Sequence, residues 1–311
     1  MNPTPRPPSP DTPHSPSPHT THASGHGDHD YDYDYDYDHN HDHTADQSEI
    51  LDLDAEVLAD HLDALTAWLP VGAAPRRILD LGCGTGAGTL ALLGRFPGAE
   101  VTAVDACDAH LDRLREKAAA AGADDRVRLV RADLDAPDWP GLGTPQLVWA
   151  SASLHHLADP VRALRRVREL LAPGGLLAVV ELAGFPRFLP ADAPESAPGL
   201  EERLHAVLDH RHTAQLPHRG ADCGPLLTGA GFTVEDRRTL RLAIGSPHTE
   251  AVGRYALGGL RRMRERAAAE LAPGDLAALD RLLDTGGPES LLRRADLAVR
   301  TERTAWAARR D

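Results

Sequence analysis

A short run of glycines directly after an apolar stretch is the feature that most limits how this chain can fold. Residues 78–88 read ILDLGCGTGAG. An apolar strand that enters such a loop and then opens a helix is typical of an α/β unit, because glycines let the backbone turn tightly and approach a ligand closely. The loop alone also fits a purely structural turn, or a dinucleotide-binding loop through the relaxed pattern Gly82-x-Gly84-x-x-Ala87.

Around this loop, short apolar runs alternate with longer runs at helical spacing. The patterns predict strands over residues 77–81, 100–105, 127–131, 146–150 and 176–182. They predict helices over residues 85–95, 109–121 and 160–171. This alternation indicates an α/β, doubly wound parallel sheet with helices on both faces. Right-handed crossovers then bring the loops after the strands to one edge, where such sheets bind ligands.

Acidic residues stand at the ends of three of these strands. Asp80 lies two residues before the first glycine, where a carboxylate would meet a cationic part of a ligand. Asp105 ends the second strand and is placed to accept hydrogen bonds from both hydroxyls of a ribose. Asp133 follows the third strand, where its carboxylate can accept a hydrogen bond from the exocyclic amine of a base. Helix capping or a surface turn is the alternative role for Asp105 and Asp133.

Taken in order, these features resemble the class I S-adenosylmethionine-dependent methyltransferases. The resemblance covers roughly residues 75–183 and includes the sequence Leu171-Ala-Pro-Gly-Gly175 before the fifth strand. It implies a Rossmann-like, seven-stranded, mostly parallel sheet with helical cap insertions, in which residues 232–244 form the sixth strand. Residues 295–308 are the candidate for an antiparallel seventh strand.

The resemblance also implies which residues hold S-adenosylmethionine. Asp80 would help to hold the methionine end, the glycines would let the backbone lie against the cofactor, Asp105 would take the ribose hydroxyls, and Asp133 with Leu134 would flank the adenine. The full expected set is Asp80, Gly82, Cys83, Gly84, Gly86, Asp105, Ala106, Asp133, Leu134 and Ser151.

The segment after the fourth strand bears on the methyl acceptor. Residues 151–157 read SASLHHL and lack the Asn/Asp-Pro-Pro-Tyr/Phe sequence of relatives that methylate bases or glutamine. The pattern looks like that of small-molecule enzymes of the ubiquinone/menaquinone and natural-product type. His155 or His156 would serve as a general base for an oxygen nucleophile. The alternatives are that the pair lines the active site without proton transfer, or that it is structural.

Two insertions, at about residues 185–219 and 246–288, are expected to roof the active site; a homodimer interface or simple packing is the alternative. Their residues 200–212 and 249–283 have helical periodicity. Several cationic side chains lie within them, either as contacts for an anionic substrate or as solvated surface: Arg254, Arg261 and Arg262. Their histidines are candidate ligands or bases, or surface residues: His205, His210, His212 and His218.

Before the glycine loop, the chain divides into a polar tail and a helix. Residues 1–46 contain nine Asp and one Arg, and residues 1–20 contain eight Pro, so no core can form there and the tail is expected to be disordered. No fixed metal site is expected, and diffuse metal binding by His39, His41 and His43 is the alternative. Leucines at helical spacing predict one amphipathic helix over residues 47–70, with order beginning near Ser48. Residues 71–311 form the remaining domain.

The composition of the chain limits the classes of partner that the protein is expected to bind. The formal net charge is −14, which argues against nucleic acid as the main partner and does not favour an anionic membrane. No apolar run approaches the ~20 residues of a membrane helix, and no signal-peptide pattern is present, so a cytoplasmic location is expected. Cys83, Cys107 and Cys223 are too scattered for a disulfide framework or a CxxC zinc site.

The sequence therefore predicts an enzyme that transfers a methyl group from S-adenosylmethionine to an oxygen or carbon atom of a small-molecule metabolite. Two alternatives stay open. One is a protein of the same fold that binds S-adenosylmethionine without turnover. The other is an NAD-dependent dehydrogenase that uses the relaxed dinucleotide pattern.

Overall fold

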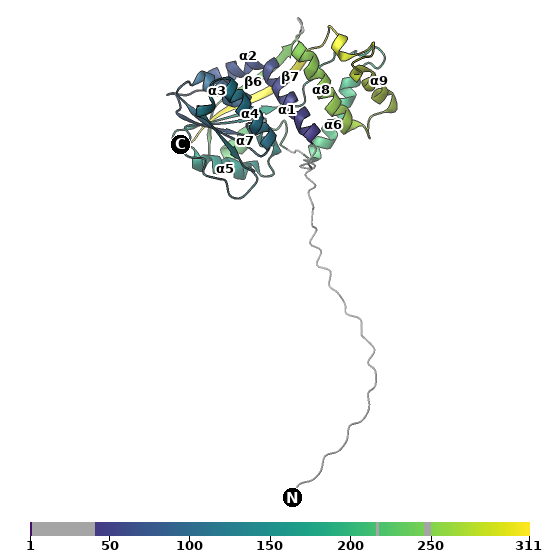
Figure 1. Ribbon diagram of the computed structural model, residues 1–311. Coiled ribbons are helices and arrows are strands. Elements are labelled where there is room, and N and C mark those ends of the chain that lie inside the picture. The colour runs from purple at the N-terminus through teal and green to yellow at the C-terminus, as the bar shows by residue number, and fades with distance from the viewer. Residues whose placement is uncertain (2–40, 216–217, 246–249) are drawn as a thin grey trace. The chain divides into compact units, whose positions relative to one another are not determined.

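The computed structural model describes Met1 and residues 41–215, 218–245 and 250–311. In this part of the chain, seven strands form one sheet in the order β3-β2-β1-β4-β5-β7-β6 (Figure 1). The strands are β1 (Arg77–Leu81), β2 (Glu100–Asp105), β3 (Val127–Arg131), β4 (Leu147–Ser151), β5 (Leu176–Leu182), β6 (Thr233–Ile244) and β7 (Val299–Arg309). The first five pair in parallel, and β7 pairs antiparallel with both β5 and β6. The predicted mostly parallel seven-stranded sheet is confirmed.

Alternate residues of the central strands pack into two separate cores, one on each face of the sheet. On one face, Leu79 and Val148 pack with apolar side chains of helices α5 (Pro160–Leu170) and α7 (Cys223–Gly229). On the other face, their neighbours Ile78 and Trp149 pack with α2 (Ala59–Trp68) and α3 (Ala87–Arg95). Both sets are buried, which explains why these strands read as continuous apolar runs and not as alternating ones. Helix α4 (Asp108–Ala120) packs Leu111 and Leu114 against Ala103 of β2.

The single helix expected over residues 47–70 is two helices. Helix α1 (His41–Val57) begins before the expected Ser48, and the chain turns at Leu58 before α2 starts. The backbone of Leu58 has φ −105° and ψ 15°, outside the helical range. The two helices have different partners, since Leu53 of α1 belongs to the core of the cap and Leu65 of α2 belongs to the core under the sheet. One straight helix would not satisfy both partners.

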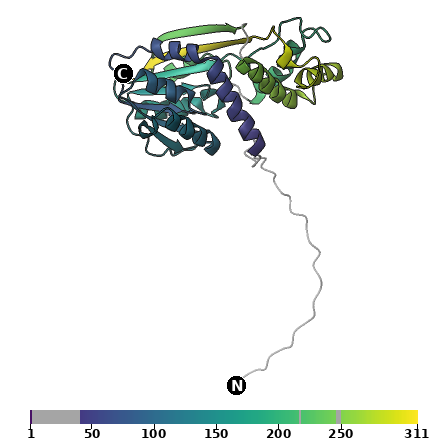
Figure 2. The ribbon, with the colours of Figure 1, turned by 45° about the horizontal axis from the view of Figure 1, so that its top comes forward.

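The two insertions form a helical cap with its own apolar core. Its helices are α6 (Leu200–Gln215), α8 (Glu250–Ala267) and α9 (Pro273–Leu283), followed by the short helix η3 (Leu291–Arg293). Leu204, Leu260 and Leu279 are all 0% exposed and pack in one cluster. Two long strands, β6 and β7, run from the sheet toward these helices (Figure 2), and Val299 at the start of β7 joins the cap core.

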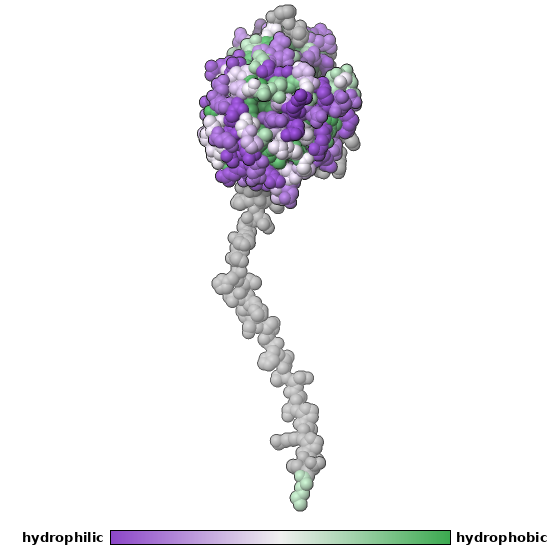
Figure 3. Space-filling view, turned by 90° about the vertical axis from the view of Figure 1, so that its left-hand side faces the viewer, coloured by the Kyte–Doolittle hydropathy of each residue, from purple (hydrophilic) through white to green (hydrophobic). Residues whose placement is uncertain are grey.

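Polar residues predominate on the face of the protein drawn in Figure 3. In the space-filling view of Figure 3, the coloured face is mostly hydrophilic, with small hydrophobic areas between the polar residues. Among the helices in the described ranges, none is long and apolar enough to cross a bilayer. Two further short helices, η1 (Asp124–Arg126) and η2 (Leu154–His156), lie in the loops before β3 and after β4.

Candidate active site

The glycine loop joins the end of β1 to the start of α3 and requires glycine at two points. Gly82 has φ +67°, and a Cβ atom there would lie 2.5 Å from Cβ of Ser153. Gly86 has φ +90°, and a Cβ atom there would lie 2.1 Å from Cδ1 of Leu114. Both the left-handed backbone and the close neighbours exclude a side chain. The amides of Gly82 and Cys83 donate to the Val104 carbonyl at 2.9 Å each, so the loop is held against β2.

Asp105, at the end of β2, holds this loop with its carboxylate. Its Oδ2 accepts a hydrogen bond from the Gly84 amide at 2.8 Å, and its Oδ1 accepts one from the Cys107 amide at 2.9 Å. Nδ1 of His110 lies 3.2 Å from the same Oδ1. Burial raises the pKa of Asp105, but the interactions with His110 and the two amides outweigh burial, so the pKa lies below its usual value. Both oxygens of this carboxylate therefore already have partners within the chain.

Asp80 lies underneath the loop and not on its surface. The residue is 2% exposed, and its Oδ2 accepts a hydrogen bond from the Thr89 hydroxyl of α3 at 2.6 Å. Burial raises the pKa of Asp80 to about 7, and the negative charge of Asp105 adds to this effect. Its carboxyl group therefore changes protonation close to neutral pH, directly below the position where the sequence places the cationic part of a ligand.

The ends of β2 and β3 lie side by side at this edge, since the amide of Ala132 donates to the Asp105 carbonyl at 3.1 Å. Asp133 is exposed, and its Oδ1 accepts a hydrogen bond from the Asp135 amide at 2.8 Å in a local turn. Leu134 is partly buried against the core. The carbonyl of Ala106 accepts a hydrogen bond from Nε of Arg131 at 3.3 Å.

The loop after β4 completes the same edge. Ser151 pairs with Val180 of β5 as the last residue of β4. Ala152 has φ +52°, a left-handed conformation that is uncommon for a residue with a side chain. Ser153 is buried against Gly82, and its Oγ has no hydrogen-bond partner in the described part of the chain. Strained backbone and an unsatisfied buried hydroxyl are both typical of functional sites.

The two histidines of this loop differ in their surroundings. His155 is 5% exposed, and its Nδ1 lies 2.5 Å from Oε2 of Glu181, whose Oε1 accepts a hydrogen bond from the Leu154 amide at 2.9 Å. Glu181 is also buried, at 3% exposed. The pair of His155 and Glu181 therefore connects the loop after β4 to β5, and His155 is almost completely enclosed.

His156 is half-buried, and its ring centroid lies 4.0 Å from that of His155. Burial lowers the pKa of His156 to about 3, and neighbouring positive charges add to this effect. These charges belong to His155, Arg219, Arg262 and Arg266. At neutral pH the imidazole of His156 is therefore uncharged and only weakly basic, which is unfavourable for a general base.

Beyond His156, side chains from three segments converge. Cζ of Arg219 lies 3.5 Å from the centre of the Phe185 ring, and this ring lies edge-on to His205 with centroids 6.4 Å apart. Burial lowers the pKa of His205 to about 4, and the charges of Arg187 and Arg219 contribute. Arg262 of α8 donates from Nη2 to Oε1 of Gln47 on α1 at 3.3 Å.

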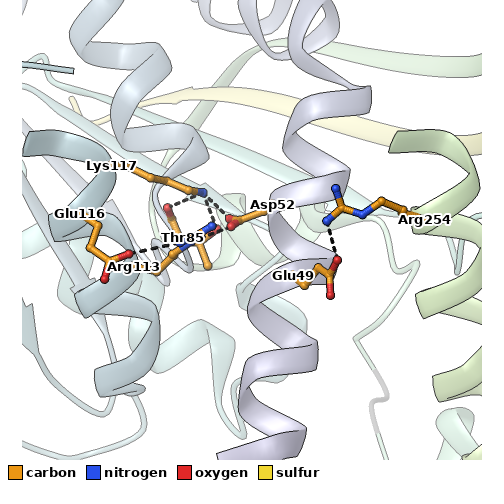
Figure 4. A network of polar contacts seen from close by, with 7 residues as sticks. All are labelled: Glu49, Asp52, Thr85, Arg113, Glu116, Lys117 and Arg254. Atoms are coloured by element: carbon orange, nitrogen blue, oxygen red, sulfur yellow. Dashed lines mark hydrogen bonds and ion pairs between the residues drawn. The ribbon is translucent and has the colours of Figure 1, made fainter. Parts of the chain in front are cut away.

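Helix α1 covers the glycine loop and connects it to the cap (Figure 4). Asp52 accepts hydrogen bonds from Lys117 and from Nε of Arg113, the latter at 2.9 Å. Lys117 also donates to the carbonyl and the hydroxyl of Thr85 in the loop, at 3.2 Å each. Cδ1 of Leu51 lies 3.4 Å from the position of a Cβ atom at Gly84. A ligand that approaches Gly84 therefore meets α1.

Several residues of this site were absent from the sequence prediction. Glu181 had a signal, because it is the single acid in the otherwise apolar strand Leu176–Leu182. Thr89, His110 and Arg219 carry no local pattern that marks them. The candidate metal residues His39, His41 and His43 lie outside the side chains that the structure describes, as does His212. Where side chains are described, no group of three His, Cys, Asp or Glu is arranged to hold a metal ion.

The structure places the remaining arginine and histidine candidates in different surroundings. Arg254 is exposed and pairs with Glu49 at 2.6 Å, and Arg261 is exposed on the same helix. Arg262 is half-buried, and its positive charge contributes to the lowered pKa of His156. His210 is exposed, His218 is half-buried and His205 is 3% exposed.

The central part of the chain is similar to known methyltransferases. Residues 79–177 match the family model described as a methyltransferase domain. The chain is 42% identical over 115 residues to a trans-aconitate 2-methyltransferase of Methylobacterium radiotolerans. The matched region covers 37% of this chain and 41% of the relative. It is 35% identical over 191 residues to a malonyl-[acyl-carrier protein] O-methyltransferase of Halorhodospira halophila, which covers 60% of each.

A third relative, a demethylmenaquinone methyltransferase of Thermus thermophilus, is 39% identical over 137 residues, 44% of this chain and 57% of the relative. The chain thus spans about 40–60% of the length of the curated relatives it matches. A solved structure from Bacillus halodurans that is grouped with the methyltransferases has a TM-score of 0.51 at 18% identity. It covers 81% of this chain and 99% of that one and supports the fold alone.

Proposed function

The chain carries a class I methyltransferase domain, and from this premise we propose that it transfers a methyl group from S-adenosylmethionine to an oxygen or carbon atom of a small molecule. S-adenosylmethionine is the methyl donor of this family. The observation that carries the proposal is the set of groups at one edge of the sheet: the glycine loop after β1, Asp105 at the end of β2 and Asp133 after β3. This edge is where doubly wound sheets bind their ligands.

The residues at this edge fit the cofactor in shape and in polarity. At Gly82 and Gly86 the backbone is bare where side chains would collide with their neighbours. Two buried polar atoms close to the loop, Oγ of Ser153 and Nε2 of His110, have no hydrogen-bond partner among the described residues. Buried polar atoms are normally paired, so unpaired ones at a site support a polar ligand there.

Each acid has a role that its position supports. Asp105 would accept hydrogen bonds from the ribose hydroxyls, because a carboxylate has room for about four hydrogen bonds and the amides of Gly84 and Cys107 use two. Asp133 would accept from the adenine amine, with Leu134 beside the ring. Asp80 would act from below the loop through its charge, since its side chain is enclosed.

When bound, S-adenosylmethionine supplies a methyl group on a positively charged sulfur that is already activated for displacement. The work of the protein is therefore mainly alignment of the acceptor atom with this methyl group, and such ordering contributes about 7–11 kcal/mol in favourable cases. Helix α1 and the cap would do this. Leu51 of α1 lies next to Gly84, Asp52 binds the Lys117 that donates to Thr85 of the loop, and Gln47 contacts the cap through Arg262.

The acceptor is assigned to small molecules on two grounds. The segment Ser151–Leu157 lacks the sequence that base and glutamine methylating relatives carry at this place. The relatives above are named for trans-aconitate, malonyl-[acyl-carrier protein] and demethylmenaquinone, none of which is a nucleic acid.

Calorimetry with S-adenosylmethionine and S-adenosylhomocysteine tests the proposal. We expect saturable one-site binding of both, followed by label transfer from methyl-labelled S-adenosylmethionine to an acceptor in an extract of small metabolites. Absence of binding at about 1 mM ligand, which corresponds to a binding free energy weaker than about 4 kcal/mol, would overturn it. Binding without transfer to any acceptor would leave a binding protein without turnover, and saturable uptake of NADH would indicate a dehydrogenase instead.

A further inference from the structure

The loops that follow β1 and β4 meet at the middle of the proposed cofactor edge. These two strands are neighbours in the sheet, but the chain continues from β1 toward β2 on one side and from β4 toward β5 on the other. Doubly wound sheets bind their ligands at such a switch point, because a crevice opens where the two loops leave in opposite directions. Ser153 in the second loop lies directly against Gly82 in the first, with its Oγ 3.3 Å from the position of a Cβ atom there.

The hydroxyl group of Ser153 is both enclosed and unpaired. The residue is 9% exposed, and its Oγ has no hydrogen-bond partner among the residues that the structure describes. Ser290 in the cap is also buried with an unpaired hydroxyl in this part of the chain, so the lack of a partner does not by itself indicate a ligand. What distinguishes Ser153 is its place at the switch point, where a ligand can supply the missing partner.

Glu181, near the end of β5, holds the loop that carries this hydroxyl. Its Oε1 accepts a hydrogen bond from the Leu154 amide at 2.9 Å, and its Oε2 lies 2.5 Å from Nδ1 of His155. Both partners directly follow Ser153 in the chain. Because Glu181 is almost fully enclosed, water cannot readily replace these partners if one of them moves away. One buried carboxylate thus fixes the two residues next to Ser153.

The residue on the other side of Ser153 is fixed as well. The amide of Ala152 donates to the Val180 carbonyl of β5 at 2.8 Å. Its backbone has φ +52°, and such a strained conformation persists only where the surrounding structure imposes it. The loop is therefore attached to β5 both before and after Ser153, and the position of the hydroxyl depends on these attachments.

The order of the strands indicates which part of the cofactor meets Ser153. Asp105 at the end of β2 is the proposed partner of the ribose, and Asp133 after β3 is the proposed partner of the adenine. The cofactor would then extend along the edge from β3 over β2 to β1, which leaves its methionine end at β1 and β4, beside Gly82. This end carries an ammonium and a carboxylate group, and a hydroxyl can bind either one because it both donates and accepts hydrogen bonds.

We propose that the hydroxyl of Ser153 binds the methionine end of S-adenosylmethionine and that Glu181 is a positioning residue, which holds Ser153 in place for this contact. The inference rests on the proposed binding of S-adenosylmethionine. Neither side chain takes part in the transfer of the methyl group. Their contribution is to fix one end of the cofactor, which limits the directions in which its methyl group can point.

Two ligands that differ in the methionine end test the contact. S-adenosylhomocysteine contains this end, whereas a methyl group replaces it in 5′-methylthioadenosine. In calorimetry on the full chain, Ser153→Ala should weaken binding of S-adenosylhomocysteine by about tenfold, which corresponds to about 1.4 kcal/mol, and should leave the affinity for 5′-methylthioadenosine within about twofold. Asp105→Asn should weaken binding of both, since both contain the ribose.

The outcomes separate this inference from the proposed function. An equal loss for the two ligands in Ser153→Ala, or no loss for S-adenosylhomocysteine, would overturn the contact while cofactor binding stands. Absence of S-adenosylhomocysteine binding in the wild type would refute the proposed function itself. Ser290→Ala is the matched control, because it removes a buried and unpaired hydroxyl in the cap, and both affinities should stay within about twofold.

A double-mutant cycle tests whether Glu181 acts through Ser153. Glu181→Ala should weaken binding of S-adenosylhomocysteine by a factor similar to that of Ser153→Ala and should spare 5′-methylthioadenosine. In the Ser153→Ala background the same substitution should cost less than about twofold more, because the hydroxyl that Glu181 positions is already absent. Glu181→Gln keeps an acceptor for the Leu154 amide and should restore most of the affinity.

Losses that add fully in the double variant, or a Glu181→Ala variant that binds both ligands equally weakly, would show a structural role only and refute the positioning role. If Glu181→Ala does not fold, His155→Phe takes its place in the cycle. This substitution breaks the same pair from the side of the loop and keeps an aromatic ring in the enclosed space. The same outcomes then support or refute the proposal.

Discussion

At the scale of single residues, Asp105 serves two purposes with one side chain. Its two oxygens already accept hydrogen bonds from Gly84 and Cys107, and His110 lies beside them. The same carboxylate is the proposed partner of the ribose hydroxyls. Replacing a residue that both shapes a loop and contacts its ligand changes stability and affinity together. Measuring both quantities in the same variants separates the two roles.

Replacing Asp105 should weaken S-adenosylmethionine binding by roughly 10- to 1000-fold, because hydrogen bonds to a charged group contribute about 1.5–3 kcal/mol each and water compensates in part. Asp105→Asn should lose nearly as much affinity as Asp105→Ala, since one acceptor becomes a donor. Unlike a residue that only faces a cavity, Asp105 should also stabilise the free protein, and so Asp105→Ala should lower its Tm. Calorimetry and thermal melting measure both, with Asp112→Asn on the exposed side of α4 as the control. Wild-type affinity in Asp105→Asn would refute the ribose contact.

Asp80 should make cofactor binding depend on pH. Its pKa is raised from 3.8 to about 7 in the folded chain, so the group keeps its proton between these values and by itself makes the free protein less stable as the pH rises from about 4 to about 7. A cationic ligand above it favours the ionised form. The affinity for S-adenosylmethionine should therefore increase between about pH 5.5 and 7, by at most tenfold per pH unit.

The measurement is calorimetry in two buffers of different ionisation enthalpy, which reports the proton released on binding at pH 6. Asp80→Asn should remove both the proton release and the pH dependence over this range. Thr89→Val, which removes the hydroxyl that donates to Asp80, should shift the pH dependence to higher pH. A pH dependence that is the same in Asp80→Asn and in the wild type would exclude Asp80 as its source.

At the scale of secondary-structure elements, α1 is the part that links the glycine loop to the cap. On one side it binds Lys117 and Arg113 of α4 through Asp52. On another side Asp54 accepts hydrogen bonds from the hydroxyl of Tyr255 on α8 at 2.7 Å and from Nη2 of Arg303 on β7 at 2.6 and 2.8 Å. This helix is therefore part of the folded domain and not an appendage to it.

Asp54→Ala should destabilise the protein by about 3 kcal/mol, because it leaves the largely buried Arg303 without its anionic partner. For a domain of this size the loss corresponds to a Tm that is lower by roughly 6–12 °C. The Tm of Asp54→Asn should lie between those of the wild type and Asp54→Ala, since asparagine keeps one acceptor oxygen. Glu56→Ala, an exposed acid on the same helix, is the control and should melt within about 1 °C of the wild type. A similar Tm for Asp54→Ala and Glu56→Ala would show that the pairing adds little.

At the scale of the whole molecule, residues 2–40 should be dispensable for the enzyme. They contain few apolar residues that could dock on the domain, and the apolar positions of α1 lie beyond them. Deletion of residues 2–40 should leave the Tm and the affinity for S-adenosylmethionine unchanged. A Tm that falls by more than about 4 °C, which corresponds to at least about 1 kcal/mol, would refute this. If the histidines of this segment bind metal, nickel should bind the full chain and not the deletion variant.

Much of the architecture follows from local patterns in the sequence. The strands β1, β4 and β5 were predictable because they are buried on both faces and read as almost uninterrupted apolar runs. Gly82 and Gly86 could be recognised in the sequence because a position with a left-handed backbone and no room for a Cβ atom accepts only glycine. The positions of Asp105 and Asp133 at one edge of the sheet were predictable because each lies at or just after the end of a predicted strand. The break at Leu58 was not predictable, because the apolar pattern continues across it. The break is set by the different packing partners of α1 and α2.

What the tertiary structure alone decided are the pairings between residues that lie far apart in the chain. Glu181 lies 26 residues from His155, and Arg303 lies 249 residues from Asp54. A periodic pattern reports which side of a helix or strand is buried, but it carries no information on which distant polar group will meet a buried one. The low pKa of His156 depends on the same effect, because it is caused by burial and by the charges of Arg219 and Arg262, which lie far away in the sequence. The sequence by itself therefore determined the sheet and the order of the glycine and acidic residues along one of its edges. The packing of α1 and the cap decided which charged groups meet, because a pairing between residues far apart in the chain exists only once the chain is folded.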